Sequence, residues 1–133
     1  KKIVKKLSLA SNEGVHIKII CRGICVLVPG IPGFSENIEI RGVIDKYLEH
    51  SRVFVFANGG SPLYYISSAD WMNRNFDYRF EVGCPVYDKR IRKELMDMME
   101  IQWADNVKAR LINSSPVNQY KKAAHGEKPI RSQ

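Results

Sequence analysis

Apolar residues recur along the chain at two spacings, and each spacing predicts a different kind of element. Ile3, Leu7 and Ala10 lie three or four positions apart, which indicates a helix that ends near Gly14, a residue suited to a left-handed cap. Apolar and polar residues then tend to alternate over 15–21, which favours a strand. The N-terminal part is therefore expected to form a helix followed by a strand.

A second helix is predicted after the turn-rich loop at 29–33. Ser35 is a suitable N-cap, and the carboxylate of Glu36 would lie in the first turn. Five apolar residues then follow the i, i+3, i+4, i+7, i+8 stripe of an amphipathic helix: Ile40, Val43, Ile44, Tyr47 and Leu48. This helix is expected to end near Glu49.

The segment 49–71 has the pattern of a β-hairpin. Two runs rich in β-branched and aromatic residues, at 53–57 and 63–67, flank the turn sequence Asn58-Gly59-Gly60-Ser61-Pro62. Antiparallel pairing would bring the residues before the first strand beside those after the second strand. The hairpin is therefore expected to gather the side chains of 50–52 and 67–70 at one edge.

The remaining pattern completes an α/β fold. Residues 73–77 are predicted to form a polar loop, and residues 78–86 are predicted to form a strand. Asp88 is expected to cap a long last helix, which would have Ile91, Leu95 and Met98 on its inner face. The order helix, strand, helix, hairpin, strand, helix predicts an α/β fold of a single domain, in which helices flank a mixed β-sheet. Past Asp105 the apolar stripe fades.

The loss of the apolar stripe after Asp105 suggests where the folded domain ends. The 133 residues are enough for one domain with a substantial core. Residues 1–105 are expected to form the folded domain, and 106–133 a C-terminal arm or tail that is partly flexible. No apolar run approaches the ~20 residues of a membrane span, and no secretory leader is expected, because the sequence shows no charged-then-apolar segment with a small-residue cleavage site. The chain opens on Lys1 with no Met, so we expect a piece of a longer protein.

Charge is concentrated at the two ends of the chain. The formal net charge is +7, but residues 7–107 carry eleven basic and thirteen acidic side chains. A nucleic-acid groove would spread basic residues over one face of the folded body. General nucleic-acid binding is therefore not favoured, although the basic ends leave a polyanion-binding role open.

The three cysteines do not form a metal motif. Cys21 and Cys25 lie four positions apart, which is not zinc spacing, and Cys84 stands alone. All three are expected to be free thiols in a reducing cytosol, which indicates a cytoplasmic protein and leaves peripheral membrane attachment open. Neither of the glycine-rich phosphate-binding motifs of the doubly wound nucleotide folds is present in the sequence.

The hairpin edge carries the candidate chemistry. His50 and Arg52 share a face if the chain is extended there, because residues i and i+2 point the same way. A neutral imidazole beside a guanidinium suits attack on, or transfer of, a phosphoryl group. Ser67 and Ser68 offer hydroxyl donors for phosphate oxygens, and Asp70 adds a carboxylate. His50 alone could equally be a residue that stabilises a helix end.

Two further residues are candidates on weaker grounds. Arg22, at the end of its strand, could reach the same sheet edge or could be an ordinary surface arginine. Glu81 lies between apolar residues and needs a partner. It could orient the imidazole of His50, or it could form an ion pair with Arg79 or Arg74.

These residues resemble the phospholipase D superfamily motif, which has H-x-K and a nearby Asp, then G-S-x-N and a later Glu. In this sequence Arg52 replaces the Lys, Ser67 replaces the Gly and Asp70 replaces the Asn, and no Asp lies four residues past Arg52. Longer motifs narrow the resemblance to the C-terminal region of the polyphosphate kinase family over 10–112. They are Arg22-Gly23-Ile24-Cys25, the loop at 29–38, Tyr47-Leu48-Glu49-His50-Ser51-Arg52, Asn58-Gly59-Gly60, Ser67-Ser68-Ala69-Asp70-Trp71-Met72, Arg74-Asn75 and Asp77-Tyr78-Arg79.

The resemblance implies a phospholipase D-like domain of an ATP:polyphosphate phosphotransferase. In that family the terminal phosphate of ATP moves to and from inorganic polyphosphate through a phosphohistidine, which lies on an upstream domain absent from this chain. Mg²⁺ would act with ATP, and no Mg²⁺ ligand is assigned here. The expected partners are ATP or ADP, polyphosphate, the upstream domains and further copies of the same chain.

The resemblance also assigns roles to residues. His50 and Arg22 would face the nucleotide phosphates and complete the site from across an interface. With the candidates above, His50 and Glu81 are the expected catalytic residues, and the expected nucleotide- or phosphate-binding residues are Arg22, His50, Arg52, Ser67 and Ser68. Two alternatives remain open: a polyanion-binding module without chemistry, and a phosphodiesterase that uses His50 as its nucleophile.

Overall fold

The structure, a computed structural model, describes residues 2–115 and 118–133. Its residues group into two compact units. One combines the residues up to Glu49 with those from Met99 onward, and we call it the discontinuous unit. The other comprises His50–Met98, and we call it the hairpin unit. Helix α3 (Lys89–Ala104) begins in the hairpin unit and ends in the discontinuous unit.

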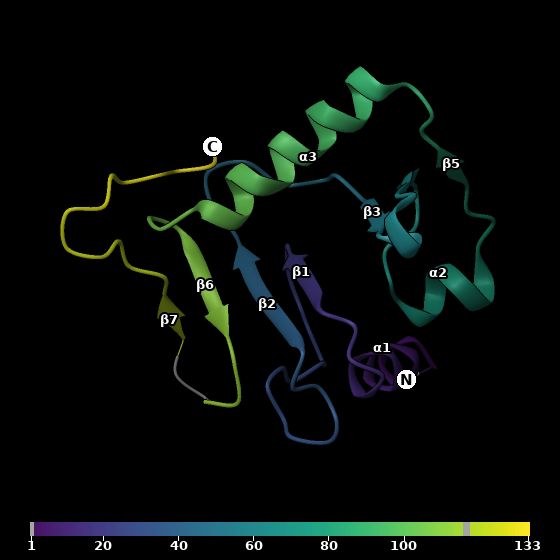
Figure 1. The fold of residues 1–133 in the computed structure, drawn as a ribbon, viewed down its shortest axis with the longest axis horizontal. Helices are drawn as coiled ribbons and strands as arrows, with labels where there is room; N and C mark the ends of the chain where they lie inside the picture. The colour runs from purple at the N-terminus through teal and green to yellow at the C-terminus, as the bar shows by residue number, and fades with distance from the viewer. Residues whose placement is uncertain (1, 116–117) are drawn as a thin grey trace. The chain divides into compact units, whose positions relative to one another are not determined.

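The discontinuous unit is built on a four-stranded sheet with the order β1-β2-β6-β7 (Figure 1). Its strands are β1 (Ile17–Cys21), β2 (Ile38–Val43), β6 (Ala109–Ile112) and β7 (Gln119–Tyr120). Strand β1 runs parallel to β2, whereas β6 is antiparallel to both β2 and β7. This confirms a mixed sheet, although it is assembled from segments at both ends of the chain.

Helix α1 (Lys2–Asn12) ends as its sequence predicts. Gly14 has a φ of +83°, in the left-handed region that favours glycine. The amide of Gly14 donates to the Ser11 carbonyl at 3.0 Å, and the amide of Val15 donates to the Ala10 carbonyl at 3.0 Å. These bonds satisfy carbonyls of the last turn, which is the role of a glycine cap.

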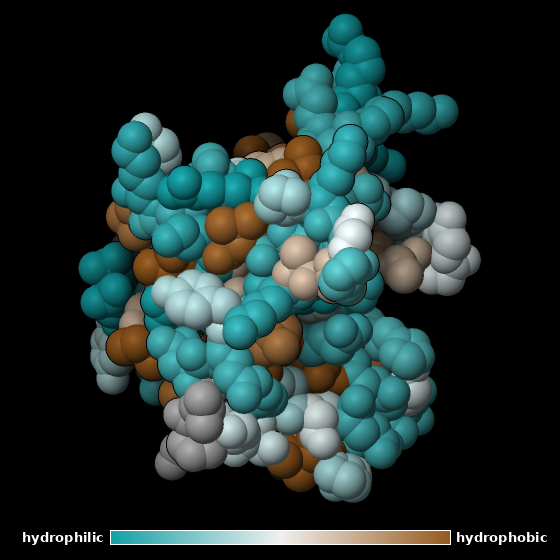
Figure 2. Space-filling view, turned by 90° about the vertical axis from the view of Figure 1, so that its left-hand side faces the viewer, coloured by the Kyte–Doolittle hydropathy of each residue, from teal (hydrophilic) through white to brown (hydrophobic). Residues whose placement is uncertain are grey.

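The core of this unit lies between the sheet and α1. Leu27, Ile38 and Ile40 are buried, and apolar residues of α1, β1 and β6 pack against them: Val4, Leu7, Ile17, Ile19 and Ile112. Figure 2 views the side of the molecule on which β7 lies in Figure 1, and that face is largely hydrophilic with small apolar patches.

The helix predicted after Ser35 is wrong. Residues 38–43 form the central strand β2, in which Ile38 and Ile40 are buried and Glu39 between them is exposed. A period of two explains this burial better than the helical stripe, which also fitted Ile40 and Val43. Strand β2 receives hydrogen bonds from a neighbour on each side, and these tertiary contacts determine its conformation.

The hairpin unit contains the hairpin that the sequence predicts. Strands β3 (Val53–Phe56) and β4 (Leu63–Ser67) pair antiparallel, with Val53 opposite Ile66. Between them lies the short 3-10 turn η1 (Asn58–Gly60), in which Asn58, Gly59 and Gly60 all have positive φ. Strand β5 (Gly83–Pro85) adds to β4 and completes a three-stranded sheet.

Two predictions in this unit are wrong. Residues 73–77, expected to be a loop, belong to helix α2 (Asn73–Tyr78). The strand expected over 78–86 is reduced to β5, because its alternating apolar side chains find no surface to cover. Tyr78 and Phe80 are almost completely exposed in the structure. The long helix α3 is confirmed, and Asp88 accepts hydrogen bonds from the amides of Arg90 and Ile91 at its start.

The C-terminal part of the chain contributes to the sheet. The domain boundary expected after residue 105 falls within the discontinuous unit, where β6 pairs with the central strand β2. The flexibility expected of 106–133 stays a prediction, and residues 116–117 of this segment lie outside the described residues. Within the described ranges, no helix combines the length and the apolar character that crossing a membrane requires.

Candidate active site

The open end of the hairpin brings the predicted groups together. The amide of Ser67 donates to the Arg52 carbonyl at 2.9 Å, which continues the β3–β4 pairing beyond Val53. The guanidinium of Arg52 holds the Asp70 carboxylate through Nε at 3.0 Å and Nη2 at 3.4 Å. Both side chains are largely buried, with 17% and 24% of their surfaces exposed. This forked pair fixes the hairpin edge.

His50 lies beside this pair and is itself exposed. Arg52 Nη1 donates to the His50 carbonyl at 3.2 Å and lies 3.4 Å from His50 Nδ1. A guanidinium has only donors, so this contact is a hydrogen bond in the tautomer whose Nδ1 is the acceptor nitrogen. In that tautomer Nε2 carries the proton and is a hydrogen-bond donor to a ligand.

The hydroxyls of Ser67 and Ser68 are engaged within the hairpin unit. Ser67 Oγ donates to the Val82 carbonyl at 3.1 Å, and Ser68 Oγ donates to the carboxylate of Glu81. Ser68 Oγ also accepts from the Val82 amide at 3.0 Å. These bonds fasten the end of β4 to the segment before β5. Because both hydroxyl hydrogens are used, direct donation to a phosphate would require one of these bonds to break.

Glu81 does not occupy the place that the sequence suggested. Its carboxylate accepts from Ser68 and from Asn75 Nδ2, the latter at 2.6 Å. In the described part of the chain none of its hydrogen bonds goes to His50, so the direct contact expected between these two side chains is not made. The bonds from Ser68 and Asn75 lower the pKa of Glu81, and the charge of Arg79 lowers it further.

Asn75 is the member of this cluster that sequence reasoning missed. It is 3% exposed and projects from α2. The signal that could have found it was the need of Glu81 for a partner, since a buried amide can serve that carboxylate as well as an arginine can. Because 73–77 was expected to be a loop, Asn75 was not considered as a fixed donor.

Arg22 belongs to the discontinuous unit, where it lines an open pocket of about 220 Å³. Residues from the end of β2 and from the segment after it form the other walls: Val43, Ile44, Asp45, Tyr47, Leu48 and Glu49. Arg22 Nη1 donates to the Glu49 carbonyl at 3.1 Å. This bond ties the guanidinium to the residue that precedes His50 in the sequence.

The described residues do not form a metal site of their own. Among them no three His, Cys, Asp or Glu side chains come close enough together to hold a cation. The two carboxylates of the hairpin edge are also engaged, Asp70 by Arg52 and Glu81 by Ser68 and Asn75. Any Mg²⁺ at the hairpin edge would therefore depend largely on ligands other than these two carboxylates, such as the oxygens of a bound nucleotide.

Comparison with known proteins shows which protein family this chain matches. The family described as "Polyphosphate kinase C-terminal domain 2" matches residues 1–133. A polyphosphate kinase of Vibrio parahaemolyticus is 50% identical over 133 residues, which are 100% of this chain and 19% of that protein. The polyphosphate kinase of Escherichia coli K12 is 45% identical over 120 residues, 90% of this chain and 17% of that protein.

A solved structure is also similar over nearly the whole chain. The crystal structure of polyphosphate kinase from Porphyromonas gingivalis matches with a TM-score of 0.93 and 49% sequence identity. The match covers 99% of this chain and 20% of that one. The chain thus spans about a fifth of the length of the relatives it matches.

Proposed function

The chain belongs to the polyphosphate kinase C-terminal domain 2 family, and from this premise we propose that it supplies part of a phosphoryl-transfer site in a longer parent protein. The parent would transfer the terminal phosphate of ATP reversibly to inorganic polyphosphate, through a phosphohistidine on an upstream domain. The substrates, the upstream partner domains and assembly into a homo-oligomer are all part of this proposal. ATP as a substrate favours a cytoplasmic location for the parent.

The observation that carries the proposal is the contact between Arg52 and His50 at the exposed hairpin edge. Arg52 contacts the Nδ1 side of the ring, so that Nε2 is the nitrogen that would meet a phosphate oxygen. We assign His50 the role of a donor, through Nε2, to charge that develops on the transferred phosphoryl group, because donors placed at such charge give large rate effects. Arg22 would supply positive charge to the same nucleotide phosphates.

The remaining predicted residues receive supporting roles. Arg52 would fix the tautomer of His50, while Ser67, Ser68 and Glu81 would hold the hairpin edge in place. Mg²⁺ would neutralise phosphate charge and would arrive with the nucleotide, whose phosphate oxygens supply most of its ligands. The phosphodiesterase and the non-catalytic module are not carried further, because the matched relatives are named polyphosphate kinases.

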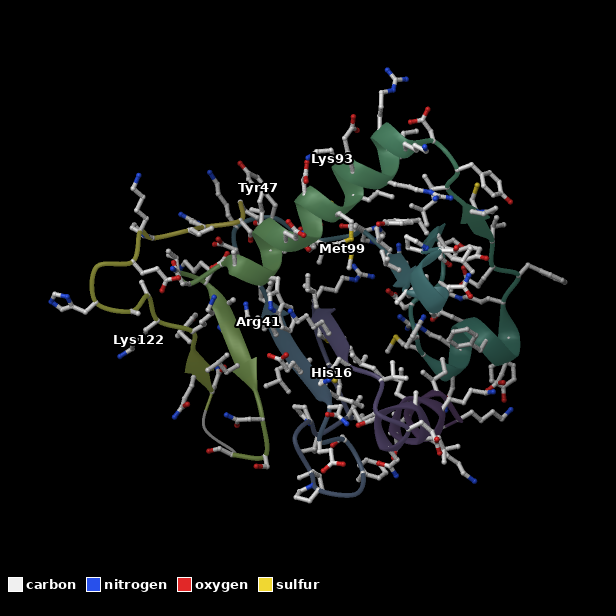
Figure 3. The ribbon with its side chains drawn as sticks, viewed as in Figure 1. His16, Arg41, Tyr47, Lys93, Met99 and Lys122 are labelled. Carbon is white, nitrogen blue, oxygen red and sulfur yellow. The ribbon has the colours of Figure 1, made fainter. Side chains whose placement is uncertain are left out.

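Turnover of full-length variants tests the proposal. His50→Ala and Arg22→Ala should each lower turnover by on the order of 10²–10³-fold, the cost of losing one donor to developing charge. His16→Ala is the matched control, because His16 is an exposed histidine at the start of β1 (Figure 3) and should leave turnover unchanged. Near-normal turnover of either variant would remove that residue from the site.

The isolated chain offers a second test. It should neither make polyphosphate from ATP nor become stably phosphorylated, because the proposed phosphohistidine is upstream. Incubation with radiolabelled ATP and Mg²⁺, followed by mass spectrometry, measures this. Label on His50 at a useful stoichiometry would instead support His50 as a nucleophile.

A further inference from the structure

The last residues of the chain hold the segment that follows β2. Arg131 donates to both carboxylate oxygens of Asp45, from Nε at 2.7 Å and from Nη2 at 2.8 Å. Gln133 Nε2 donates to the Tyr47 carbonyl at 3.0 Å, and the Tyr47 amide donates back to Gln133 Oε1 at 2.8 Å. We call these two pairs the C-terminal latch. Figure 3 shows Tyr47 beside the end of the C-terminal segment.

The residues that form the latch are themselves anchored by hydrogen bonds to Asp105 and Asn106. Asp105 is fully buried and accepts from both the amide and the hydroxyl of Ser132, at 2.9 Å and 2.8 Å. Asn106 and Ile130 exchange two further hydrogen bonds, of 3.0 Å and 2.7 Å. Asp105 also accepts from three successive amides, those of residues 107–109, the last of which begins β6. Residues 130–133 are therefore attached to the sheet, and not only to the segment that they hold.

The segment that the latch holds, residues 44–52, also makes the contact that orients the Arg22 side chain. Residues 44–52 contain neither helix nor strand, so the backbone ladder does not define their position. Asp45, Tyr47 and Glu49 line the Arg22 pocket, and the Glu49 carbonyl accepts from Arg22 Nη1. Beyond the latch, Gln102 donates to the side chain of Glu49 at 2.6 Å. External contacts thus hold a segment that has no regular structure of its own.

We infer that Arg131 and Gln133 are positioning residues for Arg22. By holding residues 45–47, they fix the Glu49 carbonyl and with it the direction of the guanidinium. A ligand that binds through Arg22 then finds the pocket already ordered, whereas without the latch its binding must also order the segment, which lowers affinity. The inference rests on the proposed function, because the ligand is the phosphate group of ATP.

The test uses the full-length parent and separates the KM for ATP from kcat. Arg131→Ala should raise the KM for ATP roughly tenfold, an effect typical of removing a residue that orients a ligand-contacting group. The kcat should change less, since the ligand itself can complete the ordering. Gln133→Ala should act in the same direction more weakly, because it removes neutral hydrogen bonds and no ion pair.

The matched control is Lys93→Ala. It breaks the Lys93–Asp97 ion pair of 2.6 Å, which has a length similar to the Arg131–Asp45 pair but lies on an exposed face of α3. It should leave the KM for ATP unchanged. A structural readout accompanies the kinetics: hydrogen exchange at the Tyr47 amide should become faster in Arg131→Ala and Gln133→Ala, and stay unchanged in the control.

The double variant decides whether the latch acts through Arg22. In the Arg22→Ala background, Arg131→Ala should add little to the KM for ATP, because residues that act through one another are not additive. Full additivity would overturn the inference, as would a KM equal to that of the control. A lower melting temperature with an unchanged KM would show a purely structural latch and overturn it too. If Arg22→Ala itself leaves turnover and KM normal, the proposed role of Arg22 fails instead.

Discussion

Among the described residues, the discontinuous unit buries five apolar side chains, Leu27, Ile38, Ile40, Val43 and Ala109, whereas the hairpin unit buries two, Ala69 and Val86. The hairpin unit relies more on directional contacts. The Arg52–Asp70 pair, the bonds of Ser68 with Glu81 and Val82, and a stacked pair of Phe54 and Trp71 at 5.2 Å hold it.

Apolar burial and directional polar contacts stabilise the two units in different ways. Burial stabilises a unit without fixing any single side chain, because the hydrophobic effect has no direction. Hydrogen bonds and ion pairs fix the groups that make them, and the candidate residues at the hairpin edge are of this kind. We therefore expect core substitutions to affect mainly the discontinuous unit, and polar substitutions to affect mainly the hairpin unit.

The largest expected effect is that of a core truncation. Ile38→Ala should lower the free energy of unfolding by about 2–5 kcal/mol, because Ile38 is 2% exposed and its loss leaves a cavity. Ile66→Ala makes the same chemical change in the hairpin unit at a residue that is 44% exposed, and should cost about 1 kcal/mol or less. Urea unfolding followed by circular dichroism measures both, and equal losses would refute the comparison.

The second effect should be confined to the hairpin unit. Asn75→Ala removes the buried donor to Glu81 and should cost about 1–3 kcal/mol. Hydrogen exchange should become faster at the Val82 amide and stay unchanged in β2. Asn12→Ala provides a control, because Asn12 makes an exposed hydrogen bond to the Gly33 carbonyl in the other unit. Uniform loss of protection in both units would contradict the expected separation.

Acid should weaken the discontinuous unit through Asp105. Burial alone would raise the pKa of Asp105, but hydrogen bonds from Lys108, Ser132 and Val107 outweigh it and lower the pKa well below the usual 3.8. The stabilisation is therefore complete above pH 3.8 and is lost as the pH falls further. Asp105→Asn should reduce stability at neutral pH and flatten its decline in acid. Thermal unfolding from pH 7 downward measures this, and an unchanged acid slope would exclude Asp105 as the cause.

The smallest effect concerns reactivity and not stability. The neighbouring thiol of Cys25, with contributions from the Gly23 backbone and the charge of Arg22, lowers the pKa of Cys21 below that of an ordinary thiol despite partial burial. Alkylation of Cys21 by iodoacetamide should therefore reach half its maximum at a lower pH than alkylation of an ordinary thiol. Cys25→Ala should move this midpoint upward with little change in melting temperature. A midpoint that stays in place would show that Cys25 does not stabilise the thiolate, and Cys84, exposed in the hairpin unit, provides an internal comparison.

Local patterns allowed several elements to be predicted. The turn Asn58-Gly59-Gly60 and the two runs beside it define the hairpin within a short segment, and the Gly14 cap and the Asp88 cap are equally local. The positions of His50, Arg52 and Asp70 followed from the same hairpin, because antiparallel pairing places the two strand ends together.

Predictions that depended on distant partners were wrong. Strand β2 shares its apolar positions with a helical stripe, and only pairing with β1 and β6 decides between the two periods. Glu81 accepts hydrogen bonds from Ser68 and Asn75, and Asn75 was missed because residues 73–77 were expected to form a loop. Arg131 gave no local signal either, because its partner Asp45 is distant in the sequence.

The sequence position of β6 has a consequence for biosynthesis. Strand β2 leaves the ribosome early and finds β1 already made, but its other neighbour, Ala109–Ile112, is translated only after the whole hairpin unit. Until then one edge of β2 exposes unpaired amides and carbonyls, which is the kind of surface that pairs with other chains. The hairpin closes early through contacts between near neighbours, and it shortens the loop that β2 and β6 must later close. Release of nascent chains that stop before residue 109 should therefore yield aggregates, whereas chains that include β6 should remain dispersed.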